Sequence, residues 1–456
     1  MAEAALIRPL AREVVGHLRS TVAITSLSMA VEELVCNSLD AGATAIDVSV
    51  QPEGGFVDVR DDGRGIDEAD LAVVGARHAT SKIRSLDDLA SASTLGYRGE
   101  ALASLGEVGV LSIHSAPAGG GGRAFEKWIK GGDTLSLGAS PRRRSQGTTV
   151  TVRDLFYNFP VRQKAARADG RKELQRIRQQ LTRLALANCA VSFSLYDSQR
   201  SCTVLQTRSV PDACVCFAHL FGQTQAGKLA RLEPEPAVEG AAAALRLEGF
   251  LSRPGCGYHT RELQFLCARR PAPAPVRADL GRGDRFVNRR FVTNTCGAQL
   301  HQRINRRMKA LCLPPSQVMQ LRAALLEQAT ADSEAPGGRG VAAIQTTEAV
   351  RAFPLFVLNL VAPPTLYDVT YEVSKTTIAF RDEEVRSAFV RRVVALPPTL
   401  TAPHLANCRQ SRPSWTLRWN GFSRRTAWGR TPHPPQPEQR AQMRLSRALN
   451  LGARLA

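Results

Sequence analysis

Three polar side chains near the N-terminus have the types and the spacing that metal-assisted hydrolysis requires. Glu33, Asn37 and Asp40 follow one another at intervals of four and three residues, so on a helix they share one face. An asparagine oxygen can ligate Mg²⁺, and a glutamate one turn away can orient and deprotonate a water molecule. Glu32 lies about 100° around such a helix and misses this face. On its own, this pattern is also typical of a solvated polar stripe on an amphipathic helix.

A glycine turn follows a strand-like run at residues 57–66. Asp61, at the end of that run, can accept a hydrogen bond from an exocyclic amino group such as that of adenine. Gly63 and Gly65 allow the backbone to approach a flat ring closely. An Asp-Gly turn is common in itself, but this one also fits a purine site.

Two further segments contain groups that bind phosphate. Thr80, Ser81 and Lys82 supply hydroxyl and ammonium donors. Residues 96–102 form a glycine loop that opens a helix, whose free backbone N–H groups attract anions. Each segment alone is also typical of a surface loop before a capped helix. All four segments, in this order, favour a nucleotide site.

The elements that must position these groups follow from periodicity. Helical spacing covers residues 12–40 and 172–187, the second with a strongly basic outer face. Strands are expected at 45–50, 55–60, 147–155 and 191–195. From residue 213, a second α+β unit is expected, with helices at 214–220 and 300–311 and strands at 245–251, 263–266, 286–293, 355–360 and 376–380.

These patterns divide the chain into three expected regions. They are a first domain at 1–212 that carries the expected nucleotide site, a second domain at 213–392 with a Pro/Arg-rich insertion near 267–285, and an irregular, disordered tail at 393–456. Residues 391–456 contain 12 arginines and one glutamate, which is +11 of the formal net charge of +19. The remainder is only mildly basic, so the total charge is weak support for a polyanionic partner.

Several other classes of site are excluded. No run approaches the roughly 20 apolar residues of a membrane helix. The ten cysteines form no Cys-x-x-Cys pair and are interpreted as reduced thiols, with no structural metal. Residues 222–228 fit most of a P-loop, but Leu229 replaces the Mg²⁺-binding hydroxyl and a helical pattern precedes it.

Together, these segments resemble the MutL family of DNA mismatch-repair ATPases. The likeness covers roughly residues 10–390 and includes the run Arg98–Leu102, which is highly specific. Asp62, the opening residues 17–26 and the stretch 370–375 are most like the subgroup of third eukaryotic MutL homologs. Other matching segments are Gly147–Val152, Leu155–Arg162 with Lys164, Phe286–Arg290 and Ser374–Phe380.

The resemblance implies an α+β architecture: a GHKL (Bergerat) ATPase α/β sandwich, then a smaller transducer domain like ribosomal protein S5 domain 2. It implies ATP and Mg²⁺ as cofactors, Glu33 as general base, Asn37 as the Mg²⁺ ligand and Lys375 as the residue that reaches the γ-phosphate. The other ATP-binding residues that it implies are Asp61, Gly63, Gly65, Thr80, Ser81, Lys82, Arg98, Gly99, Glu100, Ala101, Leu102 and Thr148.

The resemblance also implies a role in ATP-driven N-terminal association and domain closure on double-stranded DNA, in mismatch repair and in meiotic recombination. The expected partners are another MutL homolog, in a heterodimer, and mismatch-recognition proteins of the MutS type, in the nucleus. Neither the family's endonuclease motif nor its C-terminal dimerisation region is expected here. The DNA-binding candidates are basic residues after a strand end: Arg289, Arg290, Arg303, Arg306, Arg307 and Lys309.

Two alternative functions stay open at this point. The first is a clamp or scaffold that binds nucleotide without turnover, which steady-state ATPase activity distinguishes. The second is another GHKL ATPase or a histidine kinase, which shares the Asn and Asp-x-Gly-x-Gly segments. A kinase needs a phospho-accepting histidine on a dimerisation helix, and His17 is the only candidate upstream.

Overall fold

A computed structural model describes the chain at residues 16, 19–20, 22–77, 79–82, 99–119, 121–141, 145–232, 246–253, 256–269, 290–291, 294–295, 305, 353–362, 366–368 and 377–380. All of these residues fall in the first of two compact units, Met1–Pro403.

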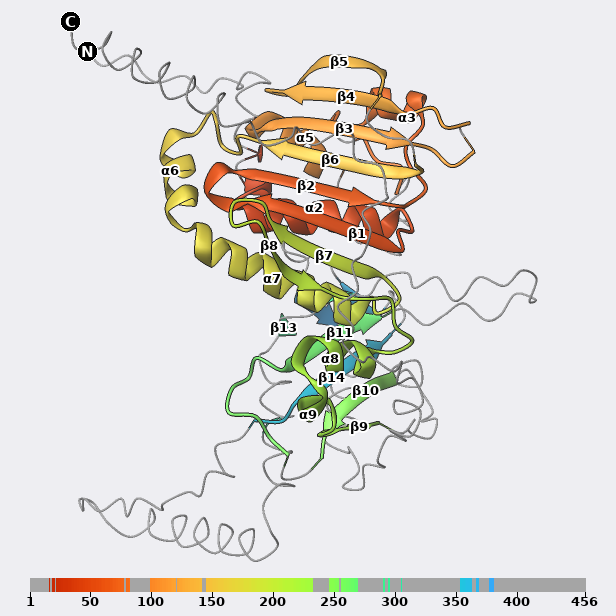
Figure 1. Ribbon diagram of the computed structural model, residues 1–456, viewed down its shortest axis with the longest axis vertical. Coiled ribbons are helices and arrows are strands. Elements are labelled where there is room, and N and C mark those ends of the chain that lie inside the picture. Colours follow the sequence, from red (N-terminus) through yellow and green to blue (C-terminus); the bar gives the residue numbers. More distant parts are fainter. Residues whose placement is uncertain are drawn as a thin grey trace, which may run out of the picture. The chain divides into compact units, whose positions relative to one another are not determined.

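The first half of the described chain forms an eight-stranded sheet in the order β5-β4-β3-β6-β2-β1-β7-β8 (Figure 1). Neighbouring strands are antiparallel except β1 and β7, which pair in parallel, with Ile46 opposite Phe193. Every second side chain of β1 is buried because successive side chains of a strand point to opposite faces. The strands are β1 (Ala45–Gln51), β2 (Phe56–Asp61), β3 (Val110–Ala116), β4 (Phe125–Lys130), β5 (Asp133–Ala139), β6 (Gly147–Arg153), β7 (Ser192–Asp197) and β8 (Cys202–Gln206).

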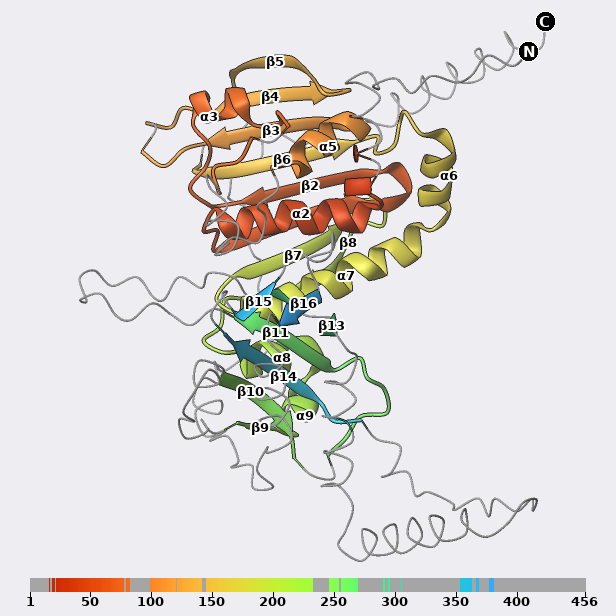
Figure 2. The same cartoon turned by 180° about the vertical axis from the view of Figure 1, so that it is seen from behind.

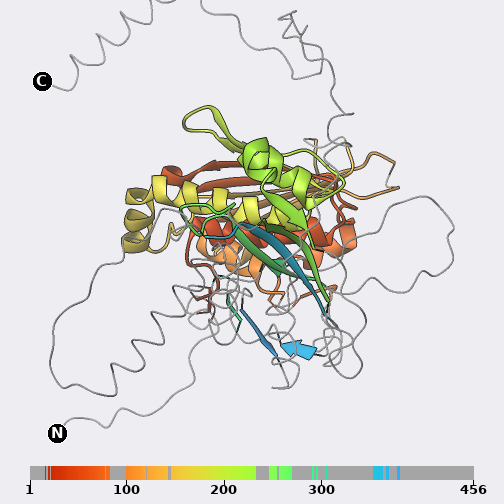
Figure 3. The same cartoon turned by 90° about the horizontal axis from the view of Figure 1, so that it is seen from below.

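Helices cover one face of this sheet and form the second layer of a sandwich (Figure 2). α2 (Leu27–Asp40) buries a stripe that includes Leu27, Val31, Leu34 and Val35, at the spacing of a helix face. Helix α6 (Pro160–Ala168) is followed directly along the chain by α7 (Gly170–Ala187) (Figure 3, yellow). The other elements of this part are η1 (Pro52–Gly54), α3 (Glu68–Val73) and α5 (Ala101–Val108).

A second sheet, of five strands, has the order β12-β11-β14-β10-β9, and three short strands pair separately as β13-β16-β15. Two helices, α8 (Ala213–Phe221) and α9 (Gln223–Ala226), precede β9 directly along the chain. The strands are β9 (Leu229–Arg231), β10 (Arg246–Ser252), β11 (Gln264–Arg269), β12 (Arg290–Phe291), β13 (Asn294–Thr295), β14 (Phe356–Val361), β15 (Tyr367–Asp368) and β16 (Thr377–Phe380).

The order of these elements excludes a P-loop at residues 222–228. That segment contains α9, follows α8 and leads into β9. A P-loop needs a strand before it and a helix after it, so that the helix N-terminus faces the phosphates. The sequence-based exclusion is therefore confirmed.

Most of the expected elements occur with shifted ends. The helix that begins at Leu27 is separated from the preceding helical residues because Ser26 caps it, its side chain accepting a hydrogen bond from Met29 N. β11 extends to Arg269, so the first residues of the expected insertion 267–285 belong to a strand. Most of the expected strand 286–293 and helix 300–311 lies outside the described residues.

The described residues contain no cluster of metal-ligating side chains and no helix long and apolar enough to cross a bilayer. Every cysteine among them is a free thiol, and Cys189, Cys216 and Cys267 are buried. Burial raises the pKa of the Cys216 thiol to about 12, with smaller contributions from Cys189 and Asp212. The Cys216 thiol is therefore protonated and packs as a small apolar group.

Candidate functional site

The helix α2 directs two adjacent glutamates in different directions. Glu33 lines a cavity of about 190 Å³. Glu32 points to α7, where Gln180 Nε2 donates a hydrogen bond of 2.7 Å to its Oε2. The two side chains differ by about 100° because each residue of a helix rotates by that angle. The expected division between Glu32 and Glu33 is therefore what the structure shows.

The same cavity brings together segments that are far apart in the sequence. Asn37, one turn after Glu33, also lines it. The cavity is also lined by the segment 80–82 and by residues before and at the start of α5. They are most of the expected phosphate-binding residues: Thr80, Ser81, Lys82, Gly99, Glu100, Ala101 and Leu102. The other lining residues are apolar: Ala23, Ile24, Met29, Val74, Gly75, Ala79 and Ala103.

The ammonium group of Lys82 binds to the polar face of α2. Its Nζ lies 2.8 Å from Asn37 Oδ1 and 2.6 Å from Asp40 Oδ2. Both side chains of this ion pair are mainly buried, with 18% of Lys82 and 8% of Asp40 exposed. An amide oxygen beside a carboxylate therefore holds a cation here, and oxygen donors of this kind suit Mg²⁺ as well.

A second polar cluster surrounds Asp61, which is 5% exposed at the end of β2. Its Oδ2 accepts a hydrogen bond of 2.7 Å from Ser38 Oγ on α2. Its Oδ1 accepts backbone hydrogen bonds from Gly63 N at 3.0 Å and from Thr148 N at 3.1 Å. Asp61, Gly63 and Thr148 thus meet in space, although none of them lines the 190 Å³ cavity. Ser38 directly follows Asn37, so α2 joins the two clusters.

Two glycines of the candidate motifs allow close backbone contact. Gly65 has φ +74°, and a Cβ on it would lie 2.2 Å from the carbonyl oxygen of Ala116. Gly99 has φ +62°, and its Cβ would lie 2.7 Å from the carbonyl oxygen of Ala79. Positive φ disfavours other residues, and both contacts are to backbone, which cannot rotate away. Only glycine fits either position.

Asp62 holds the start of β1 against the glycine turn. Its Oδ1 accepts hydrogen bonds from Thr44 N at 2.7 Å and Ala45 N at 2.9 Å, and its Oδ2 accepts one from Thr44 Oγ1. Burial raises the pKa of this carboxyl, but the hydrogen bonds from Thr44 and Ala45 outweigh it and leave the pKa below its usual value. Asp62 is therefore a structural neighbour of Asp61.

Lys127 stabilises one wall of the cavity, and sequence reasoning did not identify it. The residue is 3% exposed, and its Nζ donates to the carbonyl oxygens of Ala72, at 2.7 Å, and Val74, at 2.8 Å. These carbonyls lie at the end of α3, directly before Gly75. Burial lowers the pKa of Lys127. A lysine in a strand gives no signal that it will be buried, because lysine side chains are normally exposed.

Arg77 is a second residue that sequence reasoning did not assign to the site. Its Nη2 donates to the carbonyl oxygen of Gly16 at 2.8 Å and to Ser20 Oγ at 2.7 Å. The same nitrogen lies 3.8 Å from Glu107 Oε2 on α5. Arg77 thus ties the loop before Thr80 to the N-terminal helical residues.

Some expected site residues lie outside the part of the chain that the structure describes. They are Arg98, Lys375 and the DNA-binding candidates Arg289, Arg303, Arg306, Arg307 and Lys309. Arg290 is described only as a backbone position in β12. Their roles remain predictions.

Comparisons with known proteins agree with this geometry. Residues 24–124 match a family described as histidine kinase-, DNA gyrase B- and HSP90-like ATPase. The chain is similar to human DNA mismatch repair protein Mlh3, with 30% identity over 383 residues, which are 83% of this chain and 23% of that protein. It is also similar to DNA mismatch repair protein MutL of Azotobacter vinelandii, with 39% identity over 243 residues, which are 52% of this chain and 36% of that protein. The chain thus spans about a quarter to a third of the length of these curated relatives.

The fold itself has a counterpart among solved structures. A crystal structure of the N-terminal domain of a DNA repair protein superposes with a TM-score of 0.57 and 22% identity, covering 84% of this chain and 96% of that one. The α+β fold with a GHKL-type ATPase sandwich, expected from the sequence, is confirmed.

Proposed function

We propose that this chain is a DNA mismatch-repair protein of the MutL family, and that it binds ATP with Mg²⁺ and hydrolyses it with Glu33 as general base. One observation carries this proposal. Glu33 and Asn37 of α2 face a cavity whose other wall consists of hydroxyl, ammonium and glycine-loop groups. A base, a metal ligand and phosphate donors on one cavity are the parts that nucleotide hydrolysis needs.

The site divides into a base-binding end and a phosphate-binding end. Asp61 accepts a hydrogen bond from the exocyclic amino group of adenine, and the hydrogen bonds from Ser38 and Thr148 hold its carboxylate in place at the end of β2. Gly63 and Gly65 allow the ring to approach the backbone, and Thr148 supports Asp61 from β6. At the other end, Thr80 to Lys82 and Gly99 to Leu102 bind the phosphates with side-chain and backbone donors.

The oxygen donors on α2 fit a divalent cation. Asn37 Oδ1 and Asp40 Oδ2 already hold the Lys82 ammonium, so this pair of oxygens attracts positive charge. Mg²⁺, when bound through Asn37, supplies charge neutralisation for the phosphates. Lys82 then exchanges its contacts with α2 for contacts with the phosphate oxygens. Glu33, one turn before Asn37, accepts the proton of the attacking water.

The wider role follows from the relatives and rests on their names. In this proposal, residues 1–212 form the ATPase domain, residues 213–392 a transducer domain, and Lys375 reaches the γ-phosphate from the second domain. ATP binding drives N-terminal association and closure on double-stranded DNA during mismatch repair, with a meiotic role as well. The partners are another MutL homolog and mismatch-recognition proteins of the MutS type, and the location is the nucleus.

Replacing Glu33 tests the proposal. Glu33→Ala removes only the base, so we expect steady-state ATP hydrolysis to fall by at least about 100-fold, the usual contribution of a positioned base. Binding of Mg²⁺-ATP should persist. Asn37→Ala should lose both binding and turnover, because the metal ligand is gone.

The controls distinguish the alternative functions. Glu32→Ala should retain more turnover than Glu33→Ala, because Glu32 points to α7. A wild-type chain that binds ATP without turnover is a nucleotide-dependent clamp and contradicts the proposal. Transfer of radiolabelled phosphate from ATP to the chain itself indicates a kinase.

A further inference from the structure

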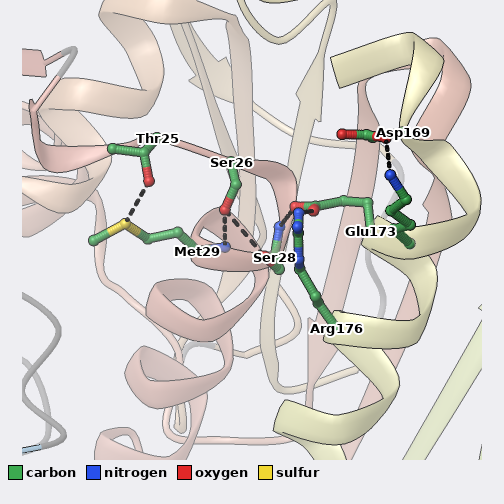
Figure 4. Close-up of polar contacts among 8 residues, drawn as sticks. Thr25, Ser26, Ser28, Met29, Asp169, Glu173 and Arg176 are labelled. Atoms are coloured by element: carbon green, nitrogen blue, oxygen red, sulfur yellow. Dashed lines mark hydrogen bonds and ion pairs between the residues drawn. The ribbon is translucent and has the colours of Figure 1, made fainter. Parts of the chain in front are cut away.

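The buried carboxylate of Glu173 reaches from α7 to the first turn of α2 (Figure 4). Glu173 is 6% exposed. Its Oε1 accepts a hydrogen bond of 2.6 Å from the backbone N–H of Ser28. Its Oε2 accepts one of 2.8 Å from Arg176 on the next turn of α7. This carboxylate is therefore fully engaged, with one oxygen on each helix.

The first turn of a helix contains backbone N–H groups that have no partner within the helix. In α2, the backbone N–H of Met29 donates a hydrogen bond of 3.1 Å to Ser26 Oγ, and the backbone N–H of Ser28 donates to Glu173 Oε1. Negative charge at this end also interacts favourably with the helix dipole. The bond from Met29 lies within α2, whereas the bond from Ser28 ends on α7 and therefore ties the first turn of α2 to that helix.

A second contact between the same two helices fixes the rotation of α2. Gln180 lies seven residues after Glu173, which is two helical turns, so the two side chains leave the same face of α7. Gln180 Nε2 donates to Glu32 Oε2 at 2.7 Å. Arg183, one turn further on, also interacts electrostatically with Glu32. Since Glu32 is held toward α7, Glu33 must point about 100° away from it.

We propose that Glu173 and Gln180 are positioning residues for hydrolysis, setting the axial position and the rotation of the helix that carries Glu33 and Asn37. This inference rests on the proposed function. Neither residue lines the cavity, so both act through α2. An error of about 1 Å in the placement of a reacting group can reduce a rate by about 100-fold. Loss of an anchor should therefore lower kcat more than nucleotide affinity.

Substitution of Gln180 tests the rotational anchor. Gln180→Leu keeps the volume and the helix propensity but removes the donor to Glu32. We expect kcat to fall by about tenfold or more, given the sensitivity of rates to placement, while the Kd for Mg²⁺-ATP changes by less than about threefold. Gln179→Leu is the matched control, because Gln179 is on α7 but exposed, and it should leave kcat unchanged.

Exchanging the two partners provides a rescue experiment. In the double variant Glu32→Gln with Gln180→Glu, the glutamine is on α2 and the carboxylate is on α7. The hydrogen bond can then form in the opposite direction at the same net charge. We expect the double variant to recover most of the kcat that each single variant loses, as coupled neighbours do in a double-mutant cycle. A purely structural loss on α7 gives no such recovery.

Glu173 is tested by two variants. Glu173→Ala removes both hydrogen bonds of a buried carboxylate and should lower the unfolding midpoint as well as kcat. Glu173→Gln keeps an oxygen for the Ser28 N–H. Its kcat should therefore lie closer to that of the wild type than the kcat of Glu173→Ala does. Equal kcat values for the two variants, with both folded by circular dichroism, contradict axial positioning.

The outcomes separate this inference from the proposed function. A wild-type chain that binds ATP but does not turn it over refutes the proposed function, and the inference with it. A wild-type chain that hydrolyses ATP, beside a Gln180→Leu variant with the same kcat, refutes only the inference. A fall in kcat together with rescue by the exchanged pair supports it.

Discussion

At the scale of single residues, Lys82 has two consecutive roles in the proposed reaction. Without nucleotide, its ammonium is held by Asn37 and Asp40. With nucleotide, it contacts phosphate. Lys82→Met removes one charge-assisted hydrogen bond, worth about 1.5–3 kcal/mol. We therefore expect the Kd for ATP to rise by about tenfold or more, measured by isothermal calorimetry.

Lys82→Arg is the informative companion variant. It keeps the charge but not the compact ammonium that fits between Asn37 and Asp40, because guanidinium is planar and larger. Affinity intermediate between wild type and Lys82→Met is expected. An unchanged Kd for Lys82→Met would contradict a phosphate-binding role for this residue.

Asp62 gives the protein one source of acid sensitivity. Its folded pKa is below the usual value, so the ionised form stabilises the native state above about pH 4. That contribution is lost as the pH falls through the folded pKa. Asp62→Asn can keep an oxygen for the N–H groups of Thr44 and Ala45 but does not titrate. We expect the wild type to be more stable at pH 6 and the difference to shrink as the pH falls below about 4.

Denaturant unfolding of both proteins across this range measures the effect. Other carboxyl groups titrate here as well, so the informative quantity is the difference between the two midpoints at each pH. A difference that increases toward acid pH has the wrong sign and would falsify the assignment.

The role of a single residue could be predicted only where it follows from the local sequence. Glu33 and Glu32 could be told apart from helix geometry alone, because rotation per residue is fixed by the backbone. Lys127, Arg77 and Glu173 could not be identified. Their partners are backbone groups of α3, of the N-terminal residues and of α2, and no local pattern encodes a contact across such distances.

At the scale of elements, the turn between β2 and α3 depends on Gly65. Its positive φ and the 2.2 Å approach to Ala116 O both exclude a Cβ. Gly42→Ala is a matched control, since Gly42 has φ +75° but nothing lies within 4 Å of the point that a Cβ would occupy. The control should cost about 1 kcal/mol of unfolding free energy, for the left-handed conformation alone. Gly65→Ala should cost at least about twice that and also weaken nucleotide binding.

Urea unfolding and nucleotide titration of both variants test this expectation. Equal losses of stability in the two variants mean that the turn moves away from Ala116 without penalty, and that the close approach is not required for the fold.

Elements with strong periodicity were predictable, whereas the outer part of the sheet was not. β1, β2, β6, α7 and β7 lie within a few residues of their expected ranges. β3, β4 and β5 were not expected. The reasons why β3 and β5 escaped prediction are opposite. β3 is buried along almost its whole length and so does not alternate, and β5 is exposed along almost its whole length. Neither strand shows the period of two that marks a half-buried strand.

At the scale of the whole molecule, DNA binding is the property on which charge has the largest effect. We expect affinity for duplex DNA to be insensitive to sequence and to fall linearly in a plot of log affinity against log salt. Changing Arg303, Arg306 and Arg307 to Glu should reduce the slope by up to about 0.9 for each lost phosphate contact. The full chain suits this test, because wild type and variant share the Arg-rich residues 391–456.

Titrations with duplex DNA at several salt concentrations provide the measurement. Unchanged affinity and slope in the triple variant place the DNA surface elsewhere on the molecule. A matched substitution of exposed basic residues on α7, such as Arg171 and Arg178, then reports on the basic surface of that helix.

The two bonds between α2 and α7 also have a consequence for synthesis of the chain. They join residues 145 and 148 positions apart. At about 5–20 residues per second, a ribosome needs roughly 7–30 s to make α7 after α2 has left the peptidyl-transferase centre. During that interval the nascent chain already contains Glu33, Asn37 and both phosphate-binding segments, but the two contacts of α2 with α7 cannot yet form. Closing a loop of this length costs about 4 kcal/mol of chain entropy, which the packing of α7 must offset. Competence for nucleotide chemistry is therefore acquired late in translation, well after the last of these ligand-binding segments has been made.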